Sequence, residues 1–491
     1  MTDPALTLAA VGEVLRSADL LMERRGSGDV AVLGVTQDSR TVERGDLFLA
    51  WKGTGVDAHD FVPAAVEHGA VATVVERPVD VEIPQLVVTD GRRAAALVAD
   101  AVMGCPSLEL LTVGVTGTNG KTTTALLIRH LVAPEMPTAV IGTLGLIDDQ
   151  GLRPGTEGLT TPGPVQVAVW LRDLADGVTG AVVVEASSHA LAQHRLDGVS
   201  FDVAVFTNLT QDHLDYHDDT ADYLRAKARL VELVVPGGTV VVNHADPAWA
   251  SLDVGGRELR TYAVELAADL TATDVILESG GTTFTLVADG SSHAVQTPLV
   301  GLYNVENALA AIATALAAGV AIDAIVERLA SAPQASGRLE AVVTEPFTVL
   351  IDYAHTPAAL EGALAAVKPF TPGRLIVVFG AGGDRDRTKR APMAEAVRRV
   401  ADLVVLTSDN PRTEDPEIIL DDLAEGLGDA QYLRVANRRE AIRGALQAAK
   451  SGDTVVLAGK GHETYQVIGT QKHPFDERSI VRDALREMGV L

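Results

Sequence analysis

The segment from Gly114 to Thr124 carries the clearest chemistry in the sequence, because it runs Gly-Val-Thr-Gly-Thr-Asn-Gly-Lys-Thr-Thr-Thr. Glycines let backbone N–H groups turn toward phosphate oxygens, and the positive end of a following helix adds attraction. Lys121 can neutralise the charge of the β- and γ-phosphates, and Thr122 can offer its hydroxyl to Mg²⁺. The segment therefore predicts binding of ATP or GTP.

The sequence on either side predicts the elements that must position this loop. The apolar run 108–113 predicts a strand before it, and 125–131 predicts a helix after it. This order is the layout of a phosphate-binding loop. Position 115 is Val where the general pattern has Gly, so the match is to the narrower string Gly-Thr-Asn-Gly-Lys-Thr at 117–122. A chance glycine turn, a kinase and a transport ATPase are the alternatives.

Length, charge and cysteine content bound the kind of protein. A chain of 491 residues is too long for one core and suggests about three domains. The net charge of −26 argues against a nucleic-acid partner. The single cysteine, Cys105, excludes an internal disulfide and fits a reducing cytoplasm. The start Met1–Pro4 lacks the regions of a secretory signal, and the longest apolar stretch, 308–322, predicts a buried helix rather than a membrane span.

Apolar runs predict an α/β protein of three domains. In residues 1–107, the runs 30–35, 47–51, 72–75 and 85–88 and the helical pattern 94–102 predict a small α/β domain. In residues 108–336, strands at 139–141, 180–184, 203–207 and 239–243 alternate with helices and predict a mainly parallel sheet in a P-loop ATPase-like domain. Residues 337–491 contain three strand–helix units and predict a Rossmann-like domain.

Each of those three C-terminal strands ends in a polar cluster. The strands 375–379, 403–407 and 454–458 lead into Gly380-Ala-Gly-Gly-Asp-Arg385, Ser408-Asp-Asn-Pro-Arg412 and Gly459-Lys-Gly-His-Glu463. Ligands of open α/β sheets bind beyond the carboxyl ends of the strands, so the clusters should converge on a second substrate site. A dinucleotide fingerprint needs Gly where Arg385 stands, which argues against a nicotinamide or flavin enzyme.

Further candidate ligands lie between residues 185 and 227. Glu185 ends a predicted buried strand, and His213 and His217 have a helical spacing that could serve zinc, with hydrogen-bonded histidines as the alternative. Beside a phosphate loop the expected ion is Mg²⁺, which a carboxylate such as Glu185 suits better than imidazole. Lys227, taken alone, is expected to be an exposed helical lysine.

Motifs along nearly the whole chain resemble those of the Mur ligase family, which uses ATP to join an amino acid to a carboxylate. Besides the phosphate loop, they are Glu185-Ala-Ser-Ser-His-Ala-Leu, Phe206-Thr-Asn-Leu-Thr-Gln-Asp-His213-Leu-Asp-Tyr-His217, Tyr223-Leu-Arg-Ala-Lys227, Gly301-Leu-Tyr-Asn304-Val-Glu-Asn307, Gly337-Arg338-Leu-Glu, Asp352-Tyr-Ala-His355-Thr-Pro and the three C-terminal clusters. Folylpolyglutamate synthetases share the loop and carbamate motifs. The extra N-terminal domain and the string Asp-Asn-Pro-Arg argue against them.

The resemblance implies two Mg²⁺ sites and a modified lysine. Thr122 and Glu185 would hold one ion, and Glu185, His213 and a carbamylated Lys227 would serve the second. Carbamylation adds CO₂ to a neutral amine and turns a potential cation into an oxygen anion that can bind metal. Together with Lys121, these residues would form the catalytic group.

The resemblance also assigns the nucleotide site. The residues implied to bind ATP are Gly117, Thr118, Asn119, Gly120, Lys121, Thr122, Thr123, Asn304, Arg338 and Asp352. Asn304 and Asp352 resemble adenine and ribose contacts, and Arg338 resembles a residue that reaches the phosphates across the domain boundary. As alternatives, Asn304 could cap a helix starting near residue 305, and Asp352 could be a turn residue.

The implied acceptor substrate is UDP-N-acetylmuramoyl-L-Ala-D-Glu. The N-terminal domain would hold the uridine diphosphate through Gln37, Ser39, Thr54, Gly55 and Val56, although residues 37–40 are also ordinary turn chemistry. Thr160, Thr161, Ser187, Gln193 and Arg195 align with residues that grip the muramoyl dipeptide.

The C-terminal clusters would choose the amino acid. The implied contacts are Arg385, Asp409, Asn410, Pro411, Arg412, Gly459 and Glu463. Meso-diaminopimelate differs from lysine by a second carboxylate, which Arg412 can bind in bidentate fashion while Glu463 is available for an ammonium. Lysine would place its ammonium against the Arg412 guanidinium. Arg412 could instead pair with Glu414 or Asp415 on its own loop, and lysine or ornithine remains open.

The implied reaction runs through an acyl phosphate. The D-glutamyl γ-carboxylate attacks the γ-phosphorus of ATP, and the amine of the amino acid then displaces phosphate in peptidoglycan precursor synthesis. Closure of the C-terminal domain is expected to exclude water. We expect a cytoplasmic monomer. An ATP-driven binding or transport protein and a non-catalytic scaffold are the alternatives, and intact Lys121, Glu185, His213 and Lys227 argue against the scaffold.

Overall fold

The chain folds into two compact units that both mix helices with sheets, as the α/β prediction requires. The computed structural model describes residues 6–53, 55–155, 159–210, 212–213, 216–278 and 280–490. Unit 1 comprises residues 1–262 and 310–321, and unit 2 comprises residues 263–309 and 322–491. The predicted domain boundaries after residues 107 and 336 stay predictions.

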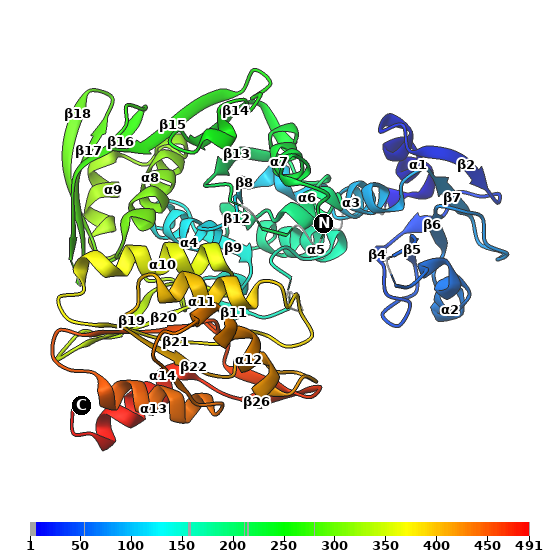
Figure 1. Cartoon of the computed structure of the whole chain (residues 1–491). Coiled ribbons are helices and arrows are strands. Elements are labelled where there is room, and N and C mark those ends of the chain that lie inside the picture. The colour runs from blue at the N-terminus through cyan, green and yellow to red at the C-terminus, as the bar shows by residue number, and fades with distance from the viewer. Residues whose placement is uncertain are drawn as a thin grey trace. The chain divides into compact units, whose positions relative to one another are not determined.

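Unit 1 begins with a five-stranded sheet of order β2-β7-β6-β5-β4 (Figure 1). Its elements and the small pair β1–β3 are β1 (Leu6–Thr7), α1 (Leu8–Ser17), β2 (Leu21–Arg25), β3 (Ala31–Val32), β4 (Gly34–Thr36), β5 (Asp46–Ala50), η1 (Ala58–Phe61), α2 (Val62–His68), β6 (Ala72–Val75), β7 (Gln85–Val88) and α3 (Gly91–Val102). Strands β4 to β7 are parallel, and β2 is antiparallel to β7. The predicted single run 30–35 is two strands with different partners.

A second sheet of unit 1 has the strand order β11-β10-β9-β12-β8-β13-β14-β15. The elements are η2 (Pro106–Glu109), β8 (Leu111–Thr116), α4 (Lys121–Val132), β9 (Thr138–Gly142), β10 (Gly145–Asp148), β11 (Gly151–Arg153), α5 (Pro164–Ala175), β12 (Ala181–Glu185), α6 (Ser188–Ala192), β13 (Phe201–Phe206), α7 (Thr220–Ala228), η3 (Arg229–Leu233), β14 (Val234–Asn243), η4 (Pro247–Trp249) and β15 (Glu258–Val264). From β9 to β15 neighbouring strands are parallel, as predicted, whereas β10 and β11 are antiparallel.

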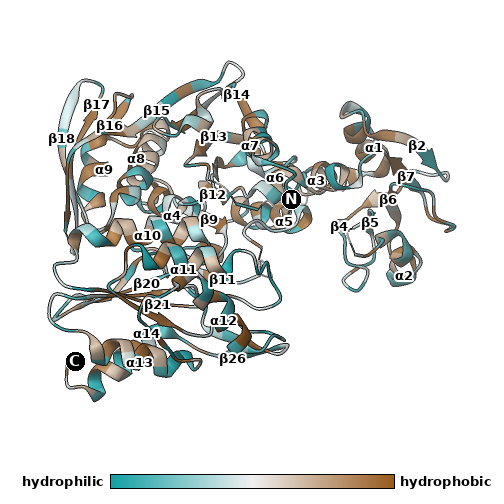
Figure 2. Cartoon of the chain, viewed as in Figure 1, coloured by the Kyte–Doolittle hydropathy of each residue, from teal (hydrophilic) through white to brown (hydrophobic). Residues whose placement is uncertain are grey.

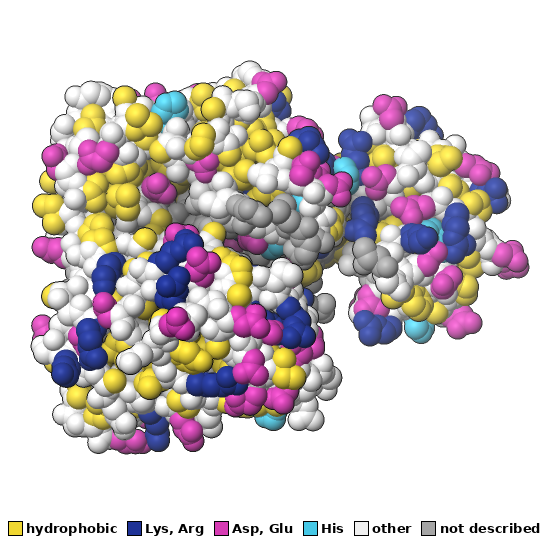
Figure 3. Space-filling view, viewed as in Figure 1, with side chains coloured by type: hydrophobic (Ala, Val, Ile, Leu, Met, Phe, Trp, Pro, Cys, Tyr) yellow, Lys and Arg dark blue, Asp and Glu magenta, His cyan; other side chains and the backbone are white. Residues whose placement is uncertain are grey.

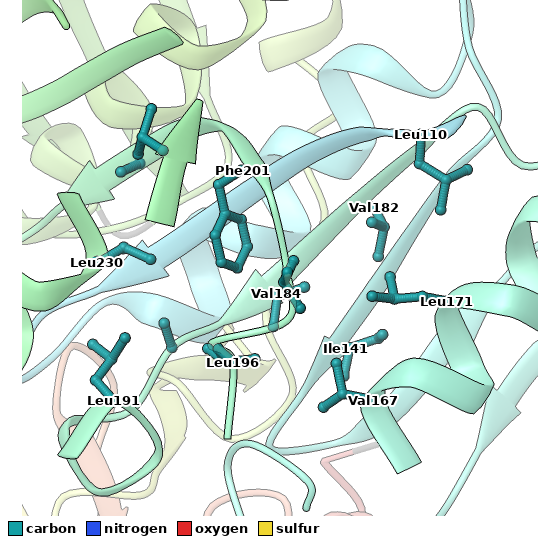
Figure 4. Close-up of a cluster of buried hydrophobic side chains, with 14 of the residues drawn as sticks. Leu110, Ile141, Val167, Leu171, Val182, Val184, Leu191, Leu196, Phe201 and Leu230 are labelled. Atoms are coloured by element: carbon teal, nitrogen blue, oxygen red, sulfur yellow. The ribbon is translucent and has the colours of Figure 1, made fainter. Parts of the chain in front are cut away.

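Aliphatic side chains fix this second sheet. Val182 and Val184 of β12 point toward Ile141 of β9 and toward Val167 and Leu171 of α5, and all five are buried (Figure 4). Burial of one such side chain contributes roughly 1.5–3 kcal/mol. The core thus holds the strands in register, so that the loops at their carboxyl ends keep fixed positions.

Unit 2 contains an antiparallel sheet of β16 (Leu270–Glu278), β17 (Gly281–Ala288) and β18 (Ser291–Thr297), with α9 (Ile322–Leu329) against β18. Helix α8 (Leu302–Ala317) precedes α9. The predicted helix 308–322 was therefore wrong in its bounds. Gly319 has φ +85°, a left-handed conformation that ends a helix.

The C-terminal sheet of unit 2 has the order β19-β20-β24-β21-β22-β23. Its elements are β19 (Glu340–Val343), β20 (Thr348–Asp352), α10 (Pro357–Val367), η5 (Lys368–Phe370), β21 (Leu375–Phe379), α11 (Arg390–Arg398), β22 (Leu403–Leu406), α12 (Pro416–Leu427), β23 (Tyr432–Arg434), α13 (Arg438–Ala448), β24 (Thr454–Ala458), β25 (Tyr465–Ile468), β26 (Gln471–Pro474) and α14 (Glu477–Glu487). Strands β20, β24, β21, β22 and β23 run parallel. Strand β21 consists of apolar residues and is brown in Figure 2. None of the helices in the described ranges is long and apolar enough to cross a membrane.

Candidate functional site

The predicted phosphate loop connects β8 to α4. Gly120 precedes the first helical residue with φ +86°, a conformation that glycine adopts at little cost. The loop is bound to the segment after β13, the parallel neighbour of β8. The N–H of Thr118 donates to the Asn208 carbonyl at 2.7 Å, and the N–H of Asn119 donates to Asn208 Oδ1 at 2.9 Å. Thr123 is buried on the first turn of α4.

The side-chain nitrogens of two lysines meet at this loop. Lys121 Nζ donates to the carbonyls of Gly117 at 2.9 Å and Thr118 at 2.8 Å, and Lys227 Nζ of α7 donates to the same Gly117 oxygen at 2.7 Å. The expectation of an exposed Lys227 was wrong, because only 1% of this residue is exposed. Burial, together with the positive charge of Lys121, lowers the pKa of Lys227 well below its usual value. A lowered pKa favours the neutral amine.

Glu185 lies at the carboxyl end of β12 beside the start of α4. Parallel pairing of β12 with β8 sets Glu185 opposite Val115. The hydroxyl of Thr122 donates to Glu185 Oε2 at 2.9 Å, and that of Thr143 donates to the same oxygen at 3.1 Å. The hydroxyls of Thr143 and Thr160 lie 3.3 Å apart. Thr143 was missed from the sequence, although its place after the neighbouring strand β9 was a signal for it. Carboxylate and hydroxyl oxygens are suitable donors for Mg²⁺.

The two histidines of the possible zinc pair lie in different environments. His213 has φ +54° outside any helix, with 46% of its side chain exposed. His217 is buried, and its Nδ1 lies 3.1 Å from Asp222 Oδ2. The ring of His189 lies against both, at centroid distances of 4.8 Å and 5.7 Å. Within the described ranges no three His, Cys, Asp or Glu residues are grouped to hold a metal, so the zinc pair stays an untested alternative.

The residues assigned to the dipeptide form one hydrogen-bonded group next to β12. Thr161 Oγ1 donates to the carbonyl of the last residue of β12 at 2.6 Å and accepts from the N–H of Ser187 at 3.1 Å. Arg195 donates to the Thr161 carbonyl at 2.8 Å and to Gln193 Oε1 at 2.7 Å. Burial, and then the nearby Arg92 guanidinium, lowers the pKa of Arg195. The guanidinium groups of Arg92 and Arg195 are therefore close together.

The N-terminal candidates lie in two turns. Gln37 places its side-chain nitrogen 3.2 Å from where a Cβ on Gly163 would lie, which sets it beside the dipeptide group. The turn interpretation of residues 37–40 was right, since the Arg40 N–H and guanidinium donate to Asp38 and lower the pKa of that carboxyl to about 2. The Ser39 carbonyl accepts from His68 Nδ1 at 2.7 Å.

The second turn is exposed. Gly53 donates its N–H to the Val56 carbonyl at 2.8 Å, and Val56 is 60% exposed. Gly55 is also exposed. Thr54 lies outside the described residues.

In unit 2, the candidate nucleotide contacts lie around the end of β20. Asp352 is buried and accepts from the N–H groups of Leu339 and Ala354, each at 2.7 Å, which agrees with a turn residue. Burial raises the pKa of Asp352, against the opposing effect of Arg338. The Arg338 guanidinium lies 4.7 Å from the centre of the Tyr353 ring.

Asn304 does not cap a helix. Helix α8 begins two residues earlier, and Asn304 Nδ2 donates to the Val300 carbonyl at 2.8 Å. Asn307 donates to Asn304 Oδ1 at 3.1 Å. The neighbouring Tyr303 has its pKa raised by burial and by the Asp352 carboxylate, so α8 and the end of β20 lie close together.

The three C-terminal clusters converge, as their strand ends predicted. Asn410 Nδ2 donates to Glu463 Oε2 at 2.9 Å, and Arg412 Nη1 donates to the Gly383 carbonyl at 2.6 Å. Asp409 Oδ2 lies 2.5 Å from where a Cβ on Gly459 would be, so only glycine fits there. Pro411 is buried between Asn410 and Arg412, whereas Arg385 is exposed.

The alternative partners of Arg412 are engaged elsewhere. Glu414 pairs with the fully buried Arg390, whose Nη2 is 2.9 Å from Oε1. Asp415 accepts from the Glu417 N–H and caps α12. The pairing of Arg412 with either acid was therefore wrong, and its guanidinium is held at Gly383 instead.

Sequence reasoning missed two parts of this region. The hairpin β25–β26 binds the loop of Arg412: the Arg412 N–H donates to the Val467 carbonyl at 3.1 Å, and the Gly469 N–H donates to the Arg412 carbonyl at 2.7 Å. The second is Lys460, fully buried, whose Nζ is 2.8 Å from Glu463 Oε2. Glu463 is thus already paired with one ammonium. A lysine between two glycines at a strand end was the signal for it.

Three family models match successive parts of the chain. They are the Mur ligase family, catalytic domain over residues 31–112, the Mur ligase middle domain over 115–315, and the Mur ligase, glutamate ligase domain over 337–461.

Named relatives and solved structures agree with these matches. A UDP-N-acetylmuramoyl-L-alanyl-D-glutamate–2,6-diaminopimelate ligase of Geobacillus thermodenitrificans is 44% identical over 95% of this chain and 97% of that protein. The protein of the same name from Gloeobacter violaceus is 42% identical over 94% and 96%. A solved structure with that name has a TM-score of 0.70 and 35% identity over 94% of this chain and 96% of its own.

A Mycobacterium tuberculosis folylpolyglutamate synthase complexed with ADP shares the fold alone, with a TM-score of 0.62 and 22% identity over 75% of this chain and 91% of its own. Identity above 40% along almost the full length, together with three matched domains in order, settles the affiliation. The chain belongs to the Mur ligase family.

Proposed function

We propose that the protein uses ATP to add meso-diaminopimelate to the D-Glu γ-carboxylate of UDP-N-acetylmuramoyl-L-Ala-D-Glu. The observation that carries the proposal is the convergence of Arg412, Asn410 and Glu463 at neighbouring strand ends. A fixed guanidinium suits the second carboxylate of diaminopimelate, and Glu463 suits an ammonium. The names of relatives 41–44% identical to the chain support the same substrate pair. We expect the protein to act as a cytoplasmic monomer.

Each step of the reaction has a group of this chain to serve it. The D-glutamyl γ-carboxylate attacks the γ-phosphorus of ATP, forming the acyl phosphate and releasing ADP. The incoming amine then attacks the acyl carbon, loses a proton and expels phosphate. Lys121 neutralises charge on the transferred phosphoryl group, and Arg195 with Thr161 orients the dipeptide. Asn304 and Asp352 would contact adenosine, and Arg338 the phosphates.

The residues present fit Mg²⁺ and a carbamylated lysine. Thr122 and Glu185, whose oxygens lie 2.9 Å apart, would hold one ion, and Glu185, His213 and carbamylated Lys227 would hold a second. Lys227 suits carbamylation because burial favours its neutral amine, which is the form that reacts with CO₂. When bound, the ions supply neutralisation of the phosphate charge.

Phosphate release measures the proposed activity directly. The enzyme is assayed with ATP, the muramoyl dipeptide and, in separate reactions, meso-diaminopimelate, lysine or ornithine. We expect release that requires both the dipeptide and meso-diaminopimelate, with a peptide product of matching mass. Release with lysine or ornithine instead would overturn the amino acid chosen. A rate of ATP hydrolysis that is the same with and without each amino acid would favour a transport or binding ATPase.

A further inference from the structure

Lys460 is a fully buried cation at the centre of the C-terminal clusters. It follows β24, and its Nζ lies 2.8 Å from Glu463 Oε2 and 3.0 Å from Asn410 Oδ1. The Tyr465 ring lies 5.9 Å from the same nitrogen. An ammonium removed from water needs such partners, since an unpaired buried charge is costly. Both polar partners are side chains assigned to the amino acid substrate.

Two other fully buried cations nearby have different partners. Arg390 pairs with Glu414 and Asp422 and donates to a carbonyl of the first cluster. Arg438 pairs with Glu477 and donates to the Ala458 carbonyl at 2.9 Å. These arginines contact backbone and acids that have no assigned role in binding substrate. Of the three, Lys460 alone contacts assigned side chains.

The contacts of Lys460 fix the orientation of both partners. Asn410 Oδ1 accepts from Lys460 and from the Val467 N–H at 2.8 Å, so its Nδ2 faces Glu463. Glu463 Oε2 accepts from Lys460 and Asn410, while within the described ranges no side-chain hydrogen bond reaches Oε1. A carboxylate held by one oxygen keeps the other for a further cation.

We propose that Lys460 is a positioning residue for the amino acid substrate. It holds Asn410 and Glu463 so that Glu463 presents Oε1 to an ammonium group of the incoming amino acid, and it does not touch the substrate itself. The inference rests on the proposed function for the identity of that substrate. Loss of Lys460 should therefore weaken amino acid binding and spare the nucleotide and the muramoyl dipeptide.

The first test measures KM for each of the three substrates, together with kcat, in Lys460→Met and Lys460→Gln. We expect Lys460→Met to raise KM for meso-diaminopimelate about tenfold and to change the other two KM values less than about twofold. Lys460→Gln keeps a hydrogen-bond donor at this position and should raise KM for meso-diaminopimelate by about threefold. Lys368→Met is the control, because Lys368 is a half-exposed lysine of the same unit that pairs with Asp402.

A double-mutant cycle then asks whether Lys460 acts through Glu463. If it does, Lys460→Met combined with Glu463→Gln should raise KM no more than Glu463→Gln alone. If the KM increases of the two single variants multiply in the double variant, or if Lys460→Met raises all three KM values equally, the proposal is overturned. Thermal unfolding shows whether each variant is folded. If Lys460→Met does not fold, Lys460→Gln takes its place in the KM comparison and in the double-mutant cycle.

Assays of the wild-type enzyme distinguish failure of the proposed function from failure of the proposed role of Lys460. If it uses lysine or ornithine, the proposed function is wrong in its amino acid, and the same KM comparison with that amino acid still tests Lys460. If KM for the amino acid in active wild type and in folded Lys460→Met agrees within about twofold, the role of Lys460 is wrong while the proposed function stands.

Discussion

The phosphate loop of unit 1 and the strand-end clusters of unit 2 hold their basic side chains in different ways. At the phosphate loop, Lys121 and Lys227 both donate to one carbonyl oxygen, that of Gly117. In the clusters, Lys460 and Arg390 each pair with a carboxylate, and their charges are matched within the protein.

This difference teaches what each region is prepared to bind. Lys121 and Lys227 both direct a side-chain nitrogen at the phosphate loop, where an anionic phosphate can bind beside the Lys121 ammonium. The clusters instead hold paired charges and present oriented groups of both signs, as a zwitterionic amino acid requires. The chain as a whole is strongly acidic, and Lys and Arg lie among Asp and Glu on the surface in Figure 3. Local arrangement therefore decides what each region attracts.

The largest expected effect tests the role of Lys121 at the phosphate loop. Lys121→Ala should lower kcat by at least about 10³-fold, because it removes the cation that neutralises the transferred phosphate. The fold should stay intact, since Lys121 is only partly buried and its hydrogen bonds to Gly117 and Thr118 reach carbonyls of the loop. ADP release and thermal unfolding measure the two effects. Normal ADP release by this variant would contradict the role of the loop.

The next largest effect tests the Arg412 guanidinium, one of the groups that the clusters offer to the amino acid. Arg412→Ala should lower kcat/KM for meso-diaminopimelate by about 10²-fold, since a carboxylate would lose its bidentate partner. Any residual activity with lysine should fall much less, because lysine has no second carboxylate. Parallel assays of the two amino acids give the ratio. An equal loss with both would mean that Arg412 supports the loop rather than the substrate.

A smaller effect on amino acid binding is expected when a side chain is added at Gly459 in the third cluster. Gly459 has φ +117°, and a Cβ there would lie 2.5 Å from Asp409 Oδ2. Gly459→Ala should therefore raise KM for the amino acid about tenfold by displacing that carboxylate. Gly428→Ala is the matched control, with φ +56° and nothing within 4 Å of the added carbon. Both should lose about 1–3 kcal/mol of unfolding free energy from backbone strain, but only the first should affect KM.

The smallest effect concerns a buried charge in neither region. Burial raises the pKa of Asp100, on α3, to about 6 from 3.8, and among the residues that the structure describes its Oδ1 has no hydrogen-bond partner. Because the folded pKa exceeds the unfolded value, the contribution of Asp100 to the free energy of unfolding is fully present below about pH 4 and is lost as pH rises from about 4 through about 6. Asp100→Asn should gain about 1 kcal/mol at pH 8 and nothing at pH 4.

Urea unfolding of both proteins at the two pH values measures this difference. A constant difference between pH 4 and pH 8 would show that the carboxyl group is not the cause.

Contiguous motifs explain which parts of the molecule could be predicted. The loop 117–122 and the strands 375–379 and 454–458 lie where the sequence placed them, because glycine spacing and apolar runs are local signals. The hairpin β25–β26 was missed because β26 is exposed at all four positions and has no apolar pattern. The burial of Lys227 could not follow from residue type, since lysines are mostly exposed. Only the motif resemblance singled it out, and its catalytic role stays a prediction.

The left-handed backbone of Arg412 limits how amino acid specificity can be redesigned. Its φ is +52°, and main-chain bonds to the hairpin on both sides maintain that conformation. An engineer who exchanges only the side chain keeps a loop shaped for the original substrate. Grafting residues 409–412 together with 465–474 from a donor enzyme would transfer the loop with its own support. The hairpin and the loop are thus one transferable cassette, although more than fifty positions separate them in the chain.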